Sequence, residues 1–267
     1  MLSKLTRDLK KSREAFEKRD VELSKAAHTT FAPEQHQQEK GKYLKSIVYG
    51  GLDGIITTFA VVAGVKGAEL SLAIVLILGI ANLLADGLSM GIGDFLSSKS
   101  EIEYQKKERE RETWEVDNFP EGEKQELIEL YQQKGLNAED SKKIVDIFSK
   151  NKKTWIDIMM IEELGIIEET ESPIGNAIAT FISFALFGAI PLITYVLALF
   201  IDPLKNNQIL LFIIACIVTS ITLFILGALK TNITGKKFWI SGLETFIVGA
   251  IAATAAYLIG FGLSFLI

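Results

Sequence analysis

Long apolar stretches alternate with charged stretches along this chain of 267 residues. Five of the apolar stretches are long enough to cross a bilayer, whose hydrocarbon core of about 30 Å needs roughly 20 apolar residues per helix. They cover residues 47–65, 70–96, 174–201, 209–229 and 238–267. The pattern therefore predicts an all-α protein with five transmembrane helices.

A polar segment, residues 99–172, separates the second span from the third, and its periodicity is helical. Its first part continues the second span outward, and a second helix begins at Pro120 and ends at Gly135. A third helix has Asn137 as its expected N-cap, and a fourth ends near Gly165. Because no strand-like alternation competes, we expect a small helical insert between transmembrane helices 2 and 3.

The first 42 residues form an N-terminal arm with a thin apolar stripe. Its apolar side chains recur every seven residues, at Leu2, Leu9, Phe16 and Leu23. We expect a helical arm that lies on the membrane or on a neighbouring protein, followed by a linker. The expected domains are the arm (1–42), helices 1–2 (43–98), the insert (99–172) and helices 3–5 (173–267).

Charge is segregated in the same way as hydropathy. The chain is 49% hydrophobic with a mean hydropathy of +0.29 and a net charge of −5, whereas the insert holds 12 basic and 20 acidic residues and is the acidic pole. An acidic insert would repel phosphate, so we expect no nucleic-acid partner. Cys216 is the only cysteine, and its apolar surroundings favour packing over chemistry.

The lysines of the short loops predict the orientation. Three of them precede the first span and three lie between the fourth and fifth, against one in each alternate loop: Lys40, Lys42 and Lys45, then Lys230, Lys236 and Lys237, against Lys66 and Lys205. Cytosolic loops carry the excess of positive charge. We therefore expect the N-terminus and the insert in the cytosol and the C-terminus on the opposite side.

Three groups of side chains in the insert have the spacing of metal ligands. They are Glu112 with Glu115, Glu123 with Glu126, and Met159 and Met160 with Glu163. Any one glutamate is explained more simply by solvation, and a methionine pair usually packs in a core. We take the methionines here as exposed, however, and thioethers beside carboxylates indicate Fe, Mn, Co or Zn rather than Mg or Ca.

The first two spans carry polar groups at depths where charge is costly. Asp53 lies in the first, and four side chains recur every four residues along the second, namely Asn82, Asp86, Met90 and Asp94. Ionisable groups at such depth normally face a bundle interior or an ion route. For Asp94, and for Glu244 near the start of the last span, a packing or interfacial role competes with a proton or ion site.

The chain resembles the vacuolar iron transporter family. The matching stretches are DGIITTFAVVAGV in the first span, LSMGIGDFLSSKSE at the end of the second, TWIDIMMIEELG at the end of the insert and SGLETFIVGA in the fifth span. The resemblance covers residues 43–267. It implies a homodimer of five-helix subunits that moves ferrous iron out of the cytosol in exchange for protons.

The resemblance also assigns roles to residues. It implies a metal path at the dimer interface that includes Asp53 and Met90, and cytosolic metal binding by the glutamates and methionines named above. Asn82 stands where the eukaryotic transporters have a glutamate, and Asp86 follows one turn later. We expect Asp53, Asp86 and Met90 to offer oxygen and sulfur ligands to Fe²⁺ within the bilayer.

Other functions stay open. A manganese transporter of the same fold would suit the carboxylates, and a membrane-anchored metal buffer or sensor would use only the insert. A membrane enzyme resembling the CDP-alcohol phosphotransferases is disfavoured, because the DG pairs here lack the following arginine. The membrane, whether vacuolar, of another organelle or a bacterial plasma membrane, is not determined by the sequence.

Overall fold

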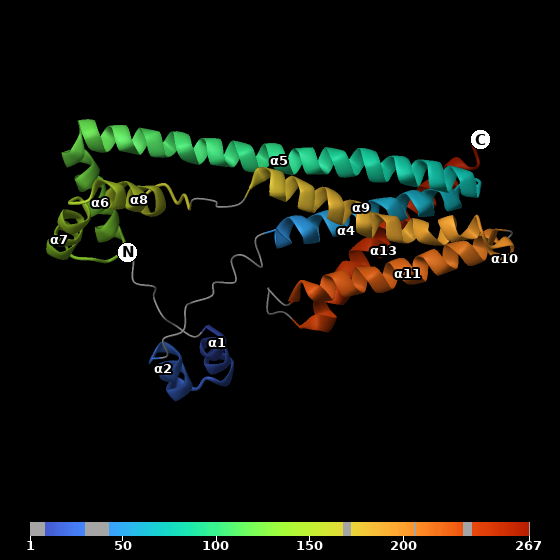
Figure 1. The fold of residues 1–267 in the computed structure, drawn as a ribbon, viewed down its shortest axis with the longest axis horizontal. Helices are drawn as coiled ribbons and strands as arrows, with labels where there is room; N and C mark the ends of the chain where they lie inside the picture. Colours follow the sequence, from blue (N-terminus) through green and yellow to red (C-terminus); the bar gives the residue numbers. More distant parts are fainter. Residues whose placement is uncertain (1–8, 30–42, 168–171, 206, 232–236, 267) are drawn as a thin grey trace. The chain divides into compact units, whose positions relative to one another are not determined.

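The computed structural model describes residues 9–29, 43–167, 172–205, 207–231 and 237–266, and every regular element among them is a helix. Five helices are long and apolar enough to cross a membrane (Figure 1). They are α4 (Leu44–Gly67), α5 (Leu72–Asn118), α9 (Pro173–Ala198), α11 (Gln208–Leu229) and α13 (Phe238–Leu263). The predicted all-α class with five candidate spans is confirmed.

The chain divides into two compact units, Met1–Lys45 and Ser46–Ile267. In the first unit, α1 (Leu9–Lys18) and α2 (Val21–Thr29) pack against each other. Arg19 adopts a positive φ of 54°, and the Asp20 carboxylate accepts a hydrogen bond from the Leu23 amide at 3.0 Å. The described part of the arm is therefore two helices rather than one, while Leu2 and most of the predicted linker lie outside the described residues.

Close backbone contacts hold α4 between two other spans. A Cβ atom on Gly54 would lie 2.3 Å from the carbonyl oxygen of Phe184 in α9, and one on Gly260 of α13 would lie 2.0 Å from the carbonyl oxygen of Gly64. Only glycine fits at such separations, and small residues are what allow membrane helices to approach closely. The first of these contacts fixes α4 directly beside Asp53.

The third span is shorter than predicted. Its helix, α9, ends at Ala198, and the short helix α10 (Asp202–Lys205) then leads to α11.

The insert consists of the outer part of α5 with α6 (Pro120–Gln133), α7 (Ala138–Phe148) and α8 (Lys152–Glu162). Asn137 caps α7 as predicted, because its Oδ1 accepts a hydrogen bond from the Asp140 amide at 2.8 Å. Gly135 and Gly165, which follow α6 and α8, have φ values of 100° and 65°. Such left-handed conformations favour glycine and end a helix.

An apolar core and ion pairs between helices hold the insert together. Arg109 of α5 donates to Asp157 of α8 at 2.6 Å, and Lys152 at the start of α8 donates to Asp117 at 2.5 Å. The buried core side chains are Val116, Leu127, Val145, Trp155, Ile156, Met159, Met160 and Ile166. Because exposed ion pairs contribute little on average, this core supplies most of the stability.

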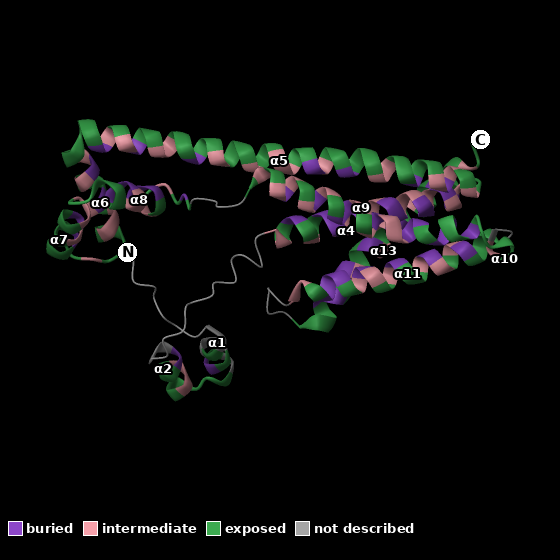
Figure 2. Ribbon diagram, viewed as in Figure 1, coloured by how far each residue is buried: buried purple, intermediate pink, exposed green. Residues whose placement is uncertain are grey.

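The outward faces of the candidate spans are apolar and exposed (Figure 2). Only 17% of the apolar window of α5 and 11% of that of α13 are buried within this chain. An apolar surface of this kind fits a bilayer or another subunit and would be unfavourable in water.

Candidate metal site

Five glutamates of the insert gather at one place. Glu112 and Glu115 lie on α5, Glu123 and Glu126 lie on α6, and Glu163 follows α8 directly. Carboxylate oxygens of the first three lie within 4.8 Å of one another, and so do those of Glu123, Glu126 and Glu163. Glu123 therefore belongs to both groups. The pairs three residues apart each share a helix face, and the turn at Phe119 brings the faces of α5 and α6 together.

Met159 and Met160 lie in the core of the insert. Their exposed fractions are 0% and 1%, so the premise that they are exposed is wrong. They pack beside Val116 and Leu127, which lie on the same two helices as four of the glutamates. Their burial has a sufficient explanation in packing, and a role of their sulfur atoms as metal ligands stays a prediction.

Glu112 is an unusual carboxylate because it is fully buried. Its exposed fraction is 0%, and neither of its carboxylate oxygens makes a well-aligned hydrogen bond to the described residues. Burial, with repulsion from Glu163, raises the pKa of Glu112 to about 7, although Arg111 opposes the shift. Among the described residues the close charged partner of Glu112 is Arg111, whose guanidinium lies 2.7 Å from Oε1 without good hydrogen-bond alignment. A buried carboxylate whose hydrogen bonds are incomplete is costly, which favours a proton or a further cation bound there.

The neighbouring glutamates respond in the same way. Burial, with repulsion from Glu126, raises the pKa of Glu123 to about 7. Burial also raises the pKa of Glu163, again with repulsion from Glu126 as the next cause. The cluster therefore holds protons near neutral pH and can exchange them for a metal ion.

These pKa values determine how the stability of the metal-free protein depends on pH. Because the pKa values of Glu112 and Glu123 rise from 4.5 to about 7 on folding, the folded state binds more protons between these values. The free energy of unfolding should fall as the pH rises through this window, by about 1.4 kcal/mol for each unit by which folding raises the pKa of a group. The thermal midpoint should thus be lower at about pH 8 than at about pH 5. Glu112→Gln should flatten this dependence, and a midpoint that rises with pH would contradict it.

Arg111 places a cation inside the acidic cluster. Its guanidinium lies 2.7 Å from Glu112 and 2.6 Å from Glu115, and it also donates to Glu108 at 3.0 Å. The sequence analysis missed this residue, although it directly precedes Glu112 and lies four residues before Glu115, a spacing that predicts an ion pair on a helix. An arriving metal ion must compete with this positive charge.

Arg111→Gln should therefore tighten metal binding, by about tenfold at about pH 8, where the carboxylates are ionised. Calorimetric titration of the detergent-solubilised protein with Mn²⁺, which is stable in air, measures this. Lys124→Gln is the matched control, because Lys124 pairs with Glu121 outside the cluster. Equal affinities of the Arg111→Gln protein and the wild type would show that the guanidinium does not oppose the metal.

Polar groups of the first two spans meet between α4 and α5. The carboxylates of Asp53 and Asp86 are close enough for Coulombic interaction. Asn82 donates to the Thr57 hydroxyl at 3.5 Å, and that hydroxyl donates to the backbone carbonyl of Asp53 at 2.8 Å. Asp53 and Met90 are half-buried and Asp86 is exposed in the single chain. Asn82 is thus attached to the turn of α4 that carries Asp53.

Asp94 connects three helices. Its Oδ2 accepts hydrogen bonds from Ser46 of α4 at 2.9 Å and from Thr180 of α9 at 2.5 Å. This geometry explains Asp94 as a packing contact, and its role as a proton site stays a prediction. Glu244, in the first two turns of α13, is exposed and lies apart from both groups of glutamates.

Five candidate spans, polar groups between two of them and a cluster of carboxylates fit a membrane transporter, and the comparisons with known proteins place the chain in that class rather than among enzymes. The chain belongs to the VIT family, whose sequence profile matches residues 44–261.

Curated relatives cover most of the chain. A protein of Toxoplasma gondii named vacuolar iron transporter is 39% identical over 265 residues, covering 95% of this chain and 88% of the relative. One of the same name from Plasmodium falciparum is 38% identical over 269 residues, covering 97% of each. Vacuolar iron transporter 1 of Arabidopsis thaliana is 34% identical over 227 residues, covering 83% and 88%.

The relatives differ in how much of this chain they cover. The family profile begins at residue 44, and the alignment with the Arabidopsis protein leaves 17% of this chain uncovered. The alignment with the Plasmodium falciparum protein leaves only 3% of 267 residues uncovered, which is about 8 residues. Most of the arm therefore has a counterpart in that relative.

Proposed function

We propose that this chain transports ferrous iron out of the cytosol in exchange for protons. The observation that carries this proposal is the cluster of five glutamates on an insert that α5 joins to five candidate spans. The name of the relatives, vacuolar iron transporter, supports iron as the cargo. The proposed domains are the N-terminal cytosolic arm (1–42), the membrane helices (43–98 and 173–267) and a cytosolic metal-binding domain (99–172).

In this function the cluster collects the ion. Its carboxylates supply oxygen ligands, and Met159 and Met160, which lie on α8 in the core of the insert, supply thioether sulfur after a small rearrangement. Mixed oxygen and sulfur ligands favour Fe²⁺ over Mg²⁺ and Ca²⁺, and the same set binds Mn²⁺, Co²⁺ or Zn²⁺.

The path through the bilayer runs along α4 and α5. A ferrous ion must exchange its water shell for protein ligands, and Asp53, Asp86 and Met90 offer oxygen and sulfur there. Carboxylates release protons when they bind a metal and can take them up again on release, which couples the two fluxes. Asp94 and Glu244 are the further candidates for the proton or ion site.

A homodimer completes this path. Asp86 lies in the apolar part of α5 and is exposed in the single chain. A carboxylate that faces lipid is unfavourable, so a second copy or a water-filled path must cover it. The low burial of α5 supports the second copy.

The orientation and the membrane are proposed on other grounds. The lysine distribution supports a cytosolic N-terminus and insert, and the names of the relatives support an organelle such as a vacuole.

Metal uptake into proteoliposomes tests the function. The purified protein should accumulate Fe²⁺ under reducing conditions faster than Mg²⁺, with protein-free vesicles as the control. Faster uptake of Mn²⁺ than of Fe²⁺ would instead support a manganese transporter. Saturable binding without uptake would support a membrane-anchored metal buffer or sensor.

A further inference from the structure

The proposed ion path and the glutamate cluster share one helix but lie far apart on it. The helix α5 runs without a break from the membrane span into the insert (Figure 1). Met90 of the path and Glu112 of the cluster are 22 residues apart, which is about 33 Å at 1.5 Å per residue. An ion collected by the cluster must cross this distance before it enters the path.

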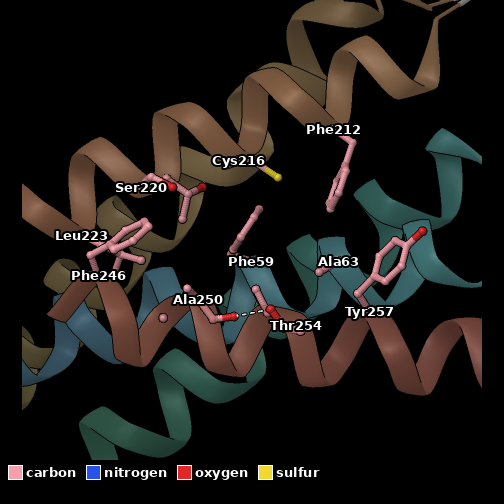
Figure 3. Close-up of a pocket in the computed structure, with 13 residues that line it drawn as sticks. Phe59, Ala63, Phe212, Cys216, Ser220, Leu223, Phe246, Ala250, Thr254 and Tyr257 are labelled. Carbon is pink, nitrogen blue, oxygen red and sulfur yellow. Dashed lines mark hydrogen bonds between the residues drawn. The ribbon is translucent and has the colours of Figure 1, made fainter. Parts of the chain in front are cut away.

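The cavity among α4, α11 and α13 does not bridge this distance (Figure 3). It has a volume of about 340 Å³, none of its lining side chains is charged, and neither Asp53 nor Asp86 is among them. Such a lining offers no carboxylate to replace the hydration of a divalent ion. The groups that can guide the ion lie instead on α5.

One face of α5 carries a polar side chain in every turn between Met90 and Glu112. These side chains, here called the α5 row, are Asp94, Ser98, Glu101, Gln105 and Glu108. Successive members are three or four residues apart. At 3.6 residues per turn, the row and its two end residues therefore fall within an arc about 80° wide.

The row lies on the sheltered side of α5. Gln105 is buried, and the other members are half-buried except Glu101, which is exposed. The opposite face is solvated, since the side chains of Glu103 and Glu110 are 66% and 69% exposed. The row therefore faces the rest of the protein, while Glu101 stays open to an arriving ion.

The two faces also differ in charge. On the opposite face, lysines four residues earlier lie 3.7 Å from Glu103 and 3.9 Å from Glu110. In the row, Glu101 instead accepts a hydrogen bond from the neutral Gln105 at 3.3 Å. The opposite face is thus close to neutral, whereas the row keeps the negative charge of Glu101.

Both ends of the row hold a buried side chain with an oxygen that lacks a hydrogen bond among the described residues. At the outer end this is Glu112, which is 0% exposed. At the inner end it is Asn176 of α9, which is 5% exposed and donates to Ser98 at 3.1 Å while its Oδ1 accepts no hydrogen bond. Buried oxygens of this kind favour a bound water or ion beside them.

We propose that the α5 row guides the metal ion from the cluster to the bilayer, with Glu101 as the carboxylate that attracts it midway. This inference rests on the proposed function. The acids Asp94, Glu101 and Glu108 are seven residues apart, or about 10 Å, which is close to the Debye length of about 10 Å at 0.1 M salt. Their fields therefore overlap along the helix, and a surface of one charge concentrates ions of the opposite charge and speeds their arrival.

Fe²⁺ uptake into proteoliposomes at a subsaturating concentration tests this role. Uptake should fall by about tenfold in Glu101→Lys and by about threefold in Glu101→Gln, and Glu101→Asp should retain it. Glu103→Lys makes the same change of charge on the opposite face and should keep the uptake of the wild type. Equal losses in Glu101→Lys and Glu103→Lys would overturn the proposal.

Metal binding separates guidance from collection. Glu101 is 11 residues from Glu112, about 16 Å along α5, which exceeds the Debye length at 0.1 M salt. Calorimetric titration of full-length Glu101→Lys with Mn²⁺ should therefore give an affinity within about twofold of the wild type. An affinity as weak as the loss of uptake would make Glu101 a part of the cluster and overturn its guiding role.

Salt gives a readout that a merely structural role would not change. Because salt screens exposed charges, the difference in uptake between Glu101→Lys and Glu103→Lys should shrink at about 0.5 M KCl. A difference that is the same at about 0.1 M and about 0.5 M KCl would contradict electrostatic guidance.

Chemical modification tests the charge within one folded protein. Glu101→Cys is made together with Cys216→Ala, which removes the only native cysteine. Modification with 2-sulfonatoethyl methanethiosulfonate adds a negative charge and should restore uptake, whereas the 2-(trimethylammonium)ethyl reagent adds a positive charge and should lower it further. Equal uptake after both reagents would overturn the proposal. Absence of Fe²⁺ uptake by the wild type would instead refute the proposed function, and this inference with it.

Discussion

Asp53→Asn should reduce Fe²⁺ uptake into proteoliposomes by at least about tenfold, because even residues that only orient a metal ligand cost 10–100-fold when they are replaced. Asparagine has nearly the shape of aspartate, and Asp53 is held on a turn of α4 that Gly54 fixes against α9. The variant should therefore fold while it lacks the negative charge that replaces the hydration of the ion.

The matched control is Glu69→Gln, which removes an exposed carboxylate from the connection between α4 and α5. Its uptake should equal that of the wild type. Thermal unfolding of both variants separates a loss of transport from a loss of folding. Wild-type uptake by the folded Asp53→Asn protein would exclude Asp53 from the path.

Glu123→Gln should weaken metal binding to the insert more than replacement of any other glutamate there, by about tenfold to a hundredfold. Glu123 is the one member shared by the two groups of carboxylates, so its loss affects both. Its pKa of about 7 adds a second signature. The metal affinity of the wild type should rise as the pH increases from about 6 to about 8, and this rise should be smaller in the variant.

Calorimetric titration of the full-length protein with Mn²⁺ at both pH values gives the affinities. Glu129→Gln is the control, because Glu129 lies on the same helix outside both groups and accepts a hydrogen bond from Gln125. If Glu123→Gln bound Mn²⁺ as tightly as the control, the cluster would not be the metal site.

Local patterns in the sequence predicted the fold well. The five spans follow from the length of apolar runs, and the ends of the insert helices follow from Asn137, Gly135 and Gly165. The grouping of four of the five glutamates was also predictable, because three-residue spacing on two adjacent helices leaves few alternatives. Glu163, at the end of α8, joins them only through the packing of the insert. The break of the arm at Arg19 was not, since no glycine or proline marks it.

Features that depend on packing between distant segments could not be predicted from the sequence. The partners of Asp94, Ser46 and Thr180, are 48 and 86 residues away, and no local pattern indicates either contact. For the methionines the prediction itself was wrong. Met159 and Met160 were expected to be exposed beside the acids, whereas the fold buries both in the core of the insert.

The coupling of metal movement to proton movement is the most direct test of the proposed function. Proteoliposomes containing a pH-sensitive dye are given Fe²⁺ across an imposed pH gradient, with Mg²⁺ and the Asp53→Ala protein as controls. The proposed exchange predicts that Fe²⁺ drives protons in the opposite direction in the wild type only. Fe²⁺ uptake without any proton movement would contradict it.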